Sequence, residues 1–303
     1  MRGPCPFAKI PYAIADILMG VRAVSFKGKS MMKHLSLGQL EGPVLVFGGP
    51  YSNLQATRAV MQVAQAREIR ASSVICTGDI VAYCGDPGET LTLVRDAGVA
   101  VVAGNCEKQL AAGAQDCGCG FETGTTCDLL SAGWFAYASA QVSQDQRIWM
   151  NQIPDVLSFE QGAKRYAVIH GGMTEIARFI WPGSEPGALL QEWSAVEAAI
   201  GPVDGIIAGH CGIPFVASTP KGDWINAGVV GMPPHDGAPQ TRYAILDKGA
   251  VTFQRLDYDV AGAVAAMTRA GLTQGYHRAL LTGYWPSEDV LPLDLRAAAL
   301  ASG

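Results

Sequence analysis

The chain alternates short apolar runs of strand length with segments of helical spacing, and this order limits the folds open to it. Pro43 to Phe47 is an apolar run that ends at Gly48-Gly49. Segment 53–66 then repeats apolar residues at helical spacing, and 73–77 is a second apolar run. This βαβ order predicts parallel strands whose carboxyl ends, with the polar residues that follow them, meet at one edge of a sheet.

Later in the chain the apolar runs follow one another closely, as in hairpins. Runs 156–160 and 165–169 form one such pair, and runs 215–218 and 223–226 form another. A second sheet is therefore expected, and the fold class is α/β (α+β): a β-sandwich flanked by helices. The remaining expected strands are 99–103, 205–208, 243–246 and 251–256, the expected helices are 87–97, 147–153, 186–200 and 259–270, and 113–126 is expected to be a loop.

Composition excludes several classes of protein. Of 303 residues, 49% are hydrophobic and 16% charged, which provides for a core and argues against disorder. The net charge is −5 without a run of Lys or Arg, so no nucleic-acid-binding face is expected. No apolar run reaches the ~18 residues of a membrane span, and the N-terminus lacks a secretory pattern. The 8 cysteines are too few for a disulfide scaffold, so a cytoplasmic protein with mostly reduced thiols is expected.

The chain divides most simply into one large domain with two appendages. Residues 41–258 carry the strand-and-helix pattern and form the expected catalytic domain. Residues 1–40 are expected to be an N-terminal extension, and 259–303 a C-terminal helical tail. The tail is a candidate contact in a homo-oligomer.

Four residues stand where side chains from different strands converge. Asp79, Asn105 and His210 each follow a glycine, and His170 closes an apolar run. One carboxylate, one amide oxygen and two imidazoles suit a divalent ion such as Mn, Fe or Zn. Taken singly, such an Asp is more often a turn residue and such a His more often a satisfied polar group. Four of them at strand ends predict a metal site.

The ordered motifs resemble those of the calcineurin-like metallophosphoesterases, in particular the compact bacterial phosphodiesterase-like branch. Gly78-Asp79, Gly104-Asn105 and the strand-end His170 are intact, whereas 49–53 and 209–212 depart from the family's Asp-x-His and Gly-His-x-His. The resemblance covers about 44–256. It implies metal-dependent hydrolysis of a small phosphomonoester or phosphodiester by metal-activated water. The alternative is a catalytically impaired protein that binds a metal or phosphorylated ligand, or regulates, on the same scaffold.

The departures fall on one of the family's two metals. The resemblance places the second metal on Asp79, Asn105, His170 and His210, all present. It places the first on positions 49, 51, 79 and 212, which here are Gly49, Tyr51, Asp79 and Gly212. We therefore expect one ion. A second ion would need other groups, and Tyr51 as a phenolate is one candidate.

The cysteines leave alternatives open. Cys106 stands where many relatives place the His that protonates the leaving group, so with Asp79 it is a candidate catalytic residue, or else a small buried hydrophobe. Cys84 and Cys211 are expected near the mouth of the site, which also permits a redox or metal-handling role. Cys117, Cys119 and Cys127 do not match the spacing of about two to four residues in paired zinc ligands.

The expected substrate contacts lie around the same strand ends. Gly49, Tyr51 and Asn53 precede a helix whose N-terminus is suited to a phosphate, although a tight strand-to-helix turn explains the glycines equally well. His235 is either a phosphate contact or an exposed turn residue. Arg178, eight residues after His170, is expected to line the substrate pocket.

Overall fold

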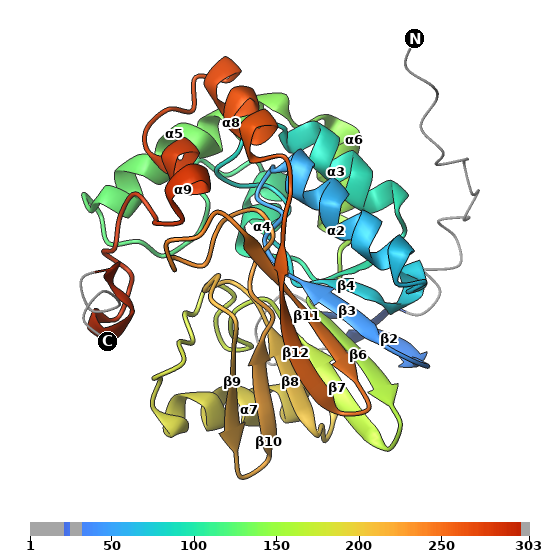
Figure 1. The fold of residues 1–303 in the computed structure, drawn as a ribbon. Helices are drawn as coiled ribbons and strands as arrows, with labels where there is room; N and C mark the ends of the chain where they lie inside the picture. The colour runs from blue at the N-terminus through green and yellow to red at the C-terminus, as the bar shows by residue number, and fades with distance from the viewer. Residues whose placement is uncertain (1–20, 25–31, 298–303) are drawn as a thin grey trace.

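Two β-sheets face each other in the computed structural model, which describes residues 21–24 and 32–297 (Figure 1). The larger sheet has the order β1-β2-β6-β7-β8-β10-β9 and the smaller one β12-β11-β3-β4-β5. The strands of the larger sheet are β1 (Val21–Val24), β2 (Met32–Gln39), β6 (Val156–Gln161), β7 (Lys164–Val168), β8 (Gly205–Ala208), β9 (Phe215–Thr219) and β10 (Gly222–Asn226). Those of the smaller sheet are β3 (Val44–Phe47), β4 (Val74–Cys76), β5 (Ala100–Val101), β11 (Thr241–Asp247) and β12 (Ala250–Leu256).

Helices cover the outer face of each sheet. Seven α-helices pack beside the smaller sheet around one apolar cluster, and α7 (Pro186–Ile200) packs on the larger sheet around another (Figure 1). The seven are α2 (Leu54–Ala66), α3 (Pro87–Asp96), α4 (Asn105–Ala112), α5 (Thr126–Gln141), α6 (Gln144–Gln152), α8 (Val260–Arg269) and α9 (Tyr276–Thr282). Short 3-10 turns occur at η1 (Ala71–Ser73) and η2 (Leu293–Leu295).

A third apolar cluster fills the space between the sheets. Successive residues of a strand point to opposite faces, so Ile206 of β8 packs toward α7 and Ile207 packs between the sheets. In β7, Ala167 likewise packs toward α7 and Val168 packs between the sheets. The predicted fold class, a β-sandwich flanked by helices, is confirmed.

Parallel pairing of the strands brings the strand ends that precede the predicted ligands to one edge of each sheet. β3, β4 and β5 are mutually parallel neighbours in the smaller sheet, and β7, β8 and β10 are parallel neighbours in the larger one. An isolated bridge between Gly48 and Val229 links the loops that leave β3 and β10. The loops after β3, β4, β5, β7 and β8 therefore meet where the two sheets lie closest.

Two helices, α4 and α5, and two strands, β1 and β2, were not expected from the sequence. α4 begins directly at Asn105, and α5 is rich in Ala, Ser and Gly without a clear apolar stripe. β2 lies within the 1–40 stretch, where it pairs in parallel with β6. In the tail, α8 and α9 contribute Ala263, Met267 and Leu280 to the main core.

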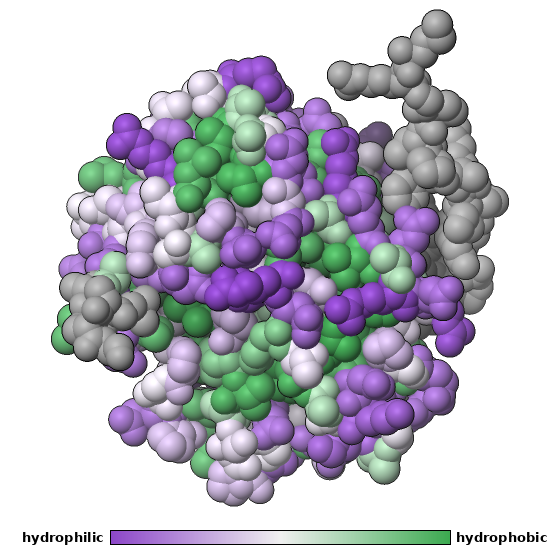
Figure 2. All heavy atoms as spheres, viewed as in Figure 1, coloured by the Kyte–Doolittle hydropathy of each residue, from purple (hydrophilic) through white to green (hydrophobic). Residues whose placement is uncertain are grey.

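The surface is that of a folded domain. Hydrophilic and hydrophobic residues are interspersed over the face drawn in Figure 2. Within residues 21–24 and 32–297, no helix has the length and apolar character that a membrane span requires.

Candidate metal centre

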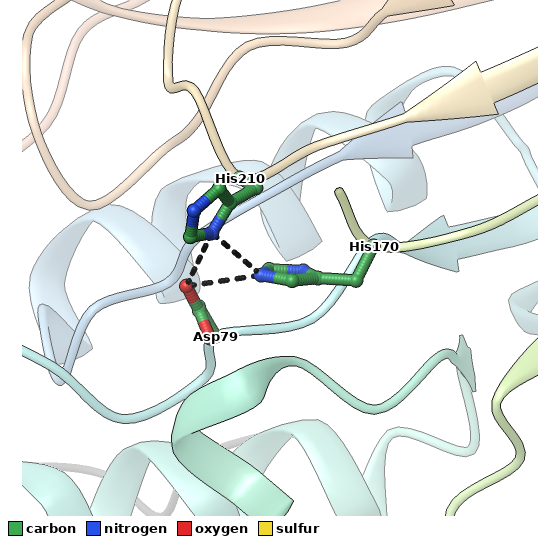
Figure 3. A group of neighbouring side chains, drawn as sticks. All are labelled: Asp79, His170 and His210. Atoms are coloured by element: carbon green, nitrogen blue, oxygen red, sulfur yellow. Dashed lines mark hydrogen bonds and ion pairs between the residues drawn. The ribbon is translucent and has the colours of Figure 1, made fainter. Parts of the chain in front are cut away.

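Four loops bring the predicted ligands together. Asp79 follows β4 and Asn105 opens α4 just after β5, so both come from the smaller sheet. His170 follows β7 and His210 follows β8, so both come from the larger sheet. Figure 3 shows Asp79, His170 and His210 pointing toward one another. Asn105 was expected at the end of a strand, but in the structure it is the first residue of α4.

The four side chains are close and buried. His170 Nε2 lies 3.2 Å from Asp79 Oδ2, 3.0 Å from Asn105 Oδ1 and 3.1 Å from His210 Nδ1. His210 Nδ1 lies 3.9 Å from Asp79 Oδ2. The exposed fractions are 5% for Asp79, 1% for Asn105, 3% for His170 and 9% for His210. Asp79, His170 and His210 alone already form a cluster able to hold a metal ion.

The hydrogen bonds around the cluster orient lone pairs toward its centre. His170 Nδ1 lies 2.6 Å from the Thr77 carbonyl oxygen, so it carries a proton and leaves Nε2 as a lone pair in the neutral ring. Asn105 Nδ2 donates to the Cys117 carbonyl at 2.8 Å, which turns Oδ1 toward His170. The inner atoms are thus a carboxylate oxygen, an amide oxygen and two imidazole nitrogens, mutually repulsive unless a proton or a cation lies among them. This donor set fits a divalent ion.

Burial and neighbouring charges shift the pKa values of the predicted ligands. Burial would raise the pKa of Asp79, but His170 and His210 hold it well below its usual range. Burial would lower the pKa of His170, yet the Asp79 carboxylate and the Thr77 hydrogen bond raise it above its usual value. Burial lowers the pKa of His210. Asp79 is therefore an anion at neutral pH and supplies the charge that a cation needs.

Glu107 holds the Asp79 loop, and the sequence reasoning missed it. Its carboxylate is fully buried and accepts the backbone N–H groups of Asp79, Ile80, Val81 and Gly104 at 2.8–3.3 Å. Burial and the nearby Asp79 raise its pKa to about 7. The available signal was a glutamate three residues after Gly104, the spacing of a side chain that turns back to cap its own helix.

Backbone strain concentrates at the same place. Asp79 has φ 55°, Tyr51 φ 52° and His210 φ 63°, in the left-handed region that residues with a Cβ seldom adopt. The Tyr51 N–H donates to the Asp79 carbonyl at 3.1 Å, so two strained residues support each other. Such strain persists where surrounding contacts impose it, and it is enriched at functional sites.

The positions of the missing first-metal ligands are filled. A Cβ atom at Gly49 would lie 2.5 Å from Cζ of Tyr51 and 2.7 Å from Cγ1 of Val229. The Tyr51 ring thus occupies the space that a side chain at 49 would take. At Gly212 a Cβ atom would lie 3.3 Å from Cζ2 of Trp285, a residue of the C-terminal tail. Burial, followed by Asp79, raises the pKa of Tyr51 well above its usual value, which disfavours the phenolate.

Three of the expected substrate contacts serve other purposes. Asn53 is buried; its Oδ1 caps α2 by accepting from Ala56 N at 3.0 Å, and its Nδ2 donates to the Gly231 carbonyl at 3.1 Å. Arg178 pairs with the buried Glu192. His235 is 1% exposed, accepts from Trp285 N at 2.8 Å and lies 2.7 Å from the Glu288 carboxylate. Structural partners thus engage the polar atoms of these three residues, and their contact with a substrate stays a prediction.

Cys106 lies in the apolar core. It is 1% exposed, its backbone N–H donates to Asp79 Oδ1 at 3.3 Å, and it packs in the main cluster. Burial, followed by Asp79 and Glu107, raises the pKa of its thiol well above its usual value, which favours the alternative of a small buried hydrophobe. The thiol is therefore neutral in this setting. The other candidate cysteines, Cys84 and Cys211, are also buried, with the pKa of Cys211 raised by burial to about 12.

The cysteine-rich loop touches the centre. Cys117 and Cys119 form a disulfide, while Cys127 is free. Asn105 Nδ2 lies 3.3 Å from Cys119 Sγ in addition to its bond to the Cys117 carbonyl. The loop thus orients one predicted ligand.

A cavity opens from the centre toward solvent. Its volume is about 60 Å³, and it reaches the predicted ligands through Asp79 and His210. Tyr51 lines it, whereas Asn53, Arg178 and His235 do not. Five of the lining residues, Tyr276 and four from the stretch 285–290, belong to the tail. No local sequence signal places Trp285 against Gly212, which lies 73 positions earlier in the chain (285 minus 212).

The comparisons with known proteins agree with this geometry. Residues 51–249 match the calcineurin-like phosphoesterase superfamily domain. An uncharacterized protein of Methanocaldococcus jannaschii, MJ0912, is 24% identical over 259 residues, which cover 79% of this chain and 98% of that protein.

Two solved structures are similar in fold. A metallophosphoesterase from Sphaerobacter thermophilus has a TM-score of 0.62 at 22% identity and covers 80% of this chain and 100% of its own. The hypothetical protein PH1004 from Pyrococcus horikoshii has a TM-score of 0.62 at 16% identity, with 80% and 99% coverage. The chain belongs to the calcineurin-like phosphoesterase superfamily, a family that uses divalent metal ions.

Proposed function

We propose that this protein is a metal-dependent phosphoesterase that hydrolyses a small phosphomonoester or phosphodiester. The observation that carries the proposal is the convergence of Asp79 Oδ2, Asn105 Oδ1, His170 Nε2 and His210 Nδ1 beside an open cavity. A divalent ion held there, Mn, Fe or Zn, lowers the pKa of water and polarises a phosphoryl oxygen when bound.

We propose that the centre holds one ion, because Tyr51 and Trp285 lie at the positions predicted to hold the first metal. Neither Gly49 nor Gly212 carries a ligand side chain. The Tyr51 ring fills the space that a side chain at 49 would take, and the Trp285 indole lies close to Gly212. A single ion neutralises less charge in the transition state than a pair does. Turnover is therefore proposed to be slower than in two-metal relatives.

The protein residues hold the reacting groups. Asp79, with its pKa held low, stays ionised and fixes the ion at the cavity floor. In the reaction, water adds a hydroxyl to phosphorus, the ester P–O bond breaks, and the departing oxygen takes the remaining proton. Cys106, the expected acid, does not line the cavity. The proton is proposed to pass from the water to the departing oxygen, either directly or through the Tyr51 hydroxyl, which gives up one proton and takes the water's proton in its place.

The test is metal content together with hydrolysis of bis(p-nitrophenyl) phosphate and p-nitrophenyl phosphate in Mn²⁺. The expected result is one equivalent of metal and measurable hydrolysis, both lost in Asp79→Asn. Asp96→Asn is the matched control, because its side chain is 61% exposed and far from the predicted ligands. One bound ion without hydrolysis of either probe would favour the alternative, a binding or regulatory protein. Two equivalents of metal would overturn the single-ion centre.

A further inference from the structure

Six of the 15 residues that line the cavity beside the candidate metal centre are aromatic. They come from five parts of the chain: the loop after β3, the loop after β4, the loop after α4, the loop after β7, and the tail. The six aromatic residues are Tyr51, Tyr83, Phe121, Phe179, Tyr276 and Trp285. Rings at this density offer stacking and edge contacts to a flat partner.

Three of the rings are in contact with one another, and Trp285 is anchored by hydrogen bonds. Tyr83 contacts Tyr51 edge to face at 4.8 Å between centroids and Tyr276 at 4.3 Å. Trp285 is fixed at both polar atoms, since its Nε1 donates to the Pro233 carbonyl at 2.7 Å and its backbone N–H to His235 at 2.8 Å. A wall held in this way loses little conformational freedom when a ligand binds.

The charge of the cavity favours a monoanion. Among the described residues that line it there is no Lys or Arg, and Asp79 is the one carboxylate. One divalent ion with one carboxylate leaves a net charge of about +1, which matches the single charge of a phosphodiester. The dianion of a phosphomonoester would keep an uncompensated charge against apolar walls, which is costly.

We propose that the preferred ligand of this site is a phosphodiester with at least one flat, uncharged aromatic ester group, and that the tail residues Trp285 and Tyr276 select it. The proposal rests on the proposed phosphoesterase function and narrows its substrate class. Both selecting residues lie beyond residues 51–249, the part that matches the family domain. Selectivity is therefore a property of this chain's own tail.

Binding is tested separately from hydrolysis with Mn²⁺-loaded protein and calorimetric titration. Diphenyl phosphate and dimethyl phosphate carry the same charge and differ in their rings. Diphenyl phosphate is expected to bind about tenfold more tightly or better, and phenyl phosphate, a dianion near neutral pH, more weakly than diphenyl phosphate. Equal binding of the two diesters would overturn the proposal.

Variants locate the selectivity in the tail. Trp285→Ala is expected to remove most of the preference for diphenyl phosphate while the metal content stays at one equivalent, and Trp285→Phe to retain part of it. If Trp285→Ala does not fold, Tyr276→Leu tests the same wall. A preference that survives both substitutions would contradict the role of the tail. Selective binding without turnover would defeat the proposed function alone, whereas turnover without selectivity would defeat this inference alone.

Discussion

The Tyr51 ring lies directly over the Cα atom of Gly49, at 2.5 Å from the position that a Cβ atom would take. From the sequence, these two residues are predicted to stand at the two positions where the family's opening motif supplies metal ligands. Their replacements are therefore complementary in space: the smaller residue makes room for the larger ring. This relationship explains why a single reversion at 49 cannot rebuild a first-metal site.

Gly49→Asp is predicted to destabilise the protein without adding a metal ion. The new side chain would clash with Tyr51 and Val229, and residue 49 has φ 38°, which disfavours a Cβ. Such overpacking costs about 1–3 kcal/mol. Denaturant unfolding and metal analysis check this result. The double variant with Tyr51→His should recover part of the lost stability, and a single variant as stable as the parent would contradict the steric explanation.

Glu107→Gln is predicted to weaken both folding and metal binding. The carboxylate accepts hydrogen bonds from four backbone N–H groups. A glutamine amide keeps one acceptor oxygen, and its NH2 group would face backbone N–H groups, which are donors too. Loss of buried acceptors costs about 1–3 kcal/mol, and loss of support behind a ligand typically lowers metal affinity about 10–100-fold. Glu89→Gln, at an exposed position, is the control. Unchanged Mn²⁺ affinity would show that Glu107 does not position Asp79.

The double substitution Cys117→Ser, Cys119→Ser is predicted to lower metal affinity about tenfold, through the orientation of Asn105. Asn105 Nδ2 donates to the Cys117 carbonyl, and the disulfide constrains that loop. Competition with a chromogenic chelator measures the affinity. Cys127→Ser is the matched control, since this cysteine lines the cavity but is free. Equal affinity in the parent and the double variant would separate the loop from the metal centre.

Glu288→Gln is predicted to destabilise the protein near neutral pH, with an effect that disappears in acid. The Ala297 N–H and His235 hold the pKa of Glu288 below its usual 4.5. A lowered folded-state pKa contributes stability above the unfolded-state value and loses it as the pH falls through the folded-state value. The contribution is at most about 1 kcal/mol, because the side chain is 33% exposed and solvent screens its interactions.

Unfolding of the parent and of Glu288→Gln at pH 7, 5 and 3 measures this effect. The difference in unfolding free energy should be present at pH 7 and should shrink below about pH 4.5. A difference that grows toward low pH would have the wrong sign for the proposed cause.

Many of the helices and strands could be predicted from the local sequence pattern. The helix over Pro186–Ile200 and the strand over Gly205–Ala208 have the bounds that the sequence predicts, because each has a clear periodicity between glycine or proline boundaries. α5 escaped prediction, since its small residues give no apolar stripe. The convergence of Asp79, His170 and His210 was also expected, because side chains at the carboxyl ends of parallel strands share one edge.

The roles of other residues depended on partners distant in sequence. Asn53, Arg178 and His235 have polar groups suited to a phosphate, yet Gly231, Glu192 and Glu288 already engage them. A sequence shows which atoms can form hydrogen bonds, but the choice among partners is made in space. Buried polar groups take the partner that the fold brings nearest, since leaving them unpaired is costly.

By itself, the sequence predicted most of the strands and helices, the family and the four residues that converge in the candidate metal centre, because these follow from short-range periodicity, ordered motifs and glycine turns. Only the tertiary structure decided that Tyr51 and Trp285 fill the positions of the lost ligands and that the tail walls the cavity. Contacts between residues such as Gly212 and Trp285 depend on how the completed layers pack, and no local preference of the chain encodes that arrangement.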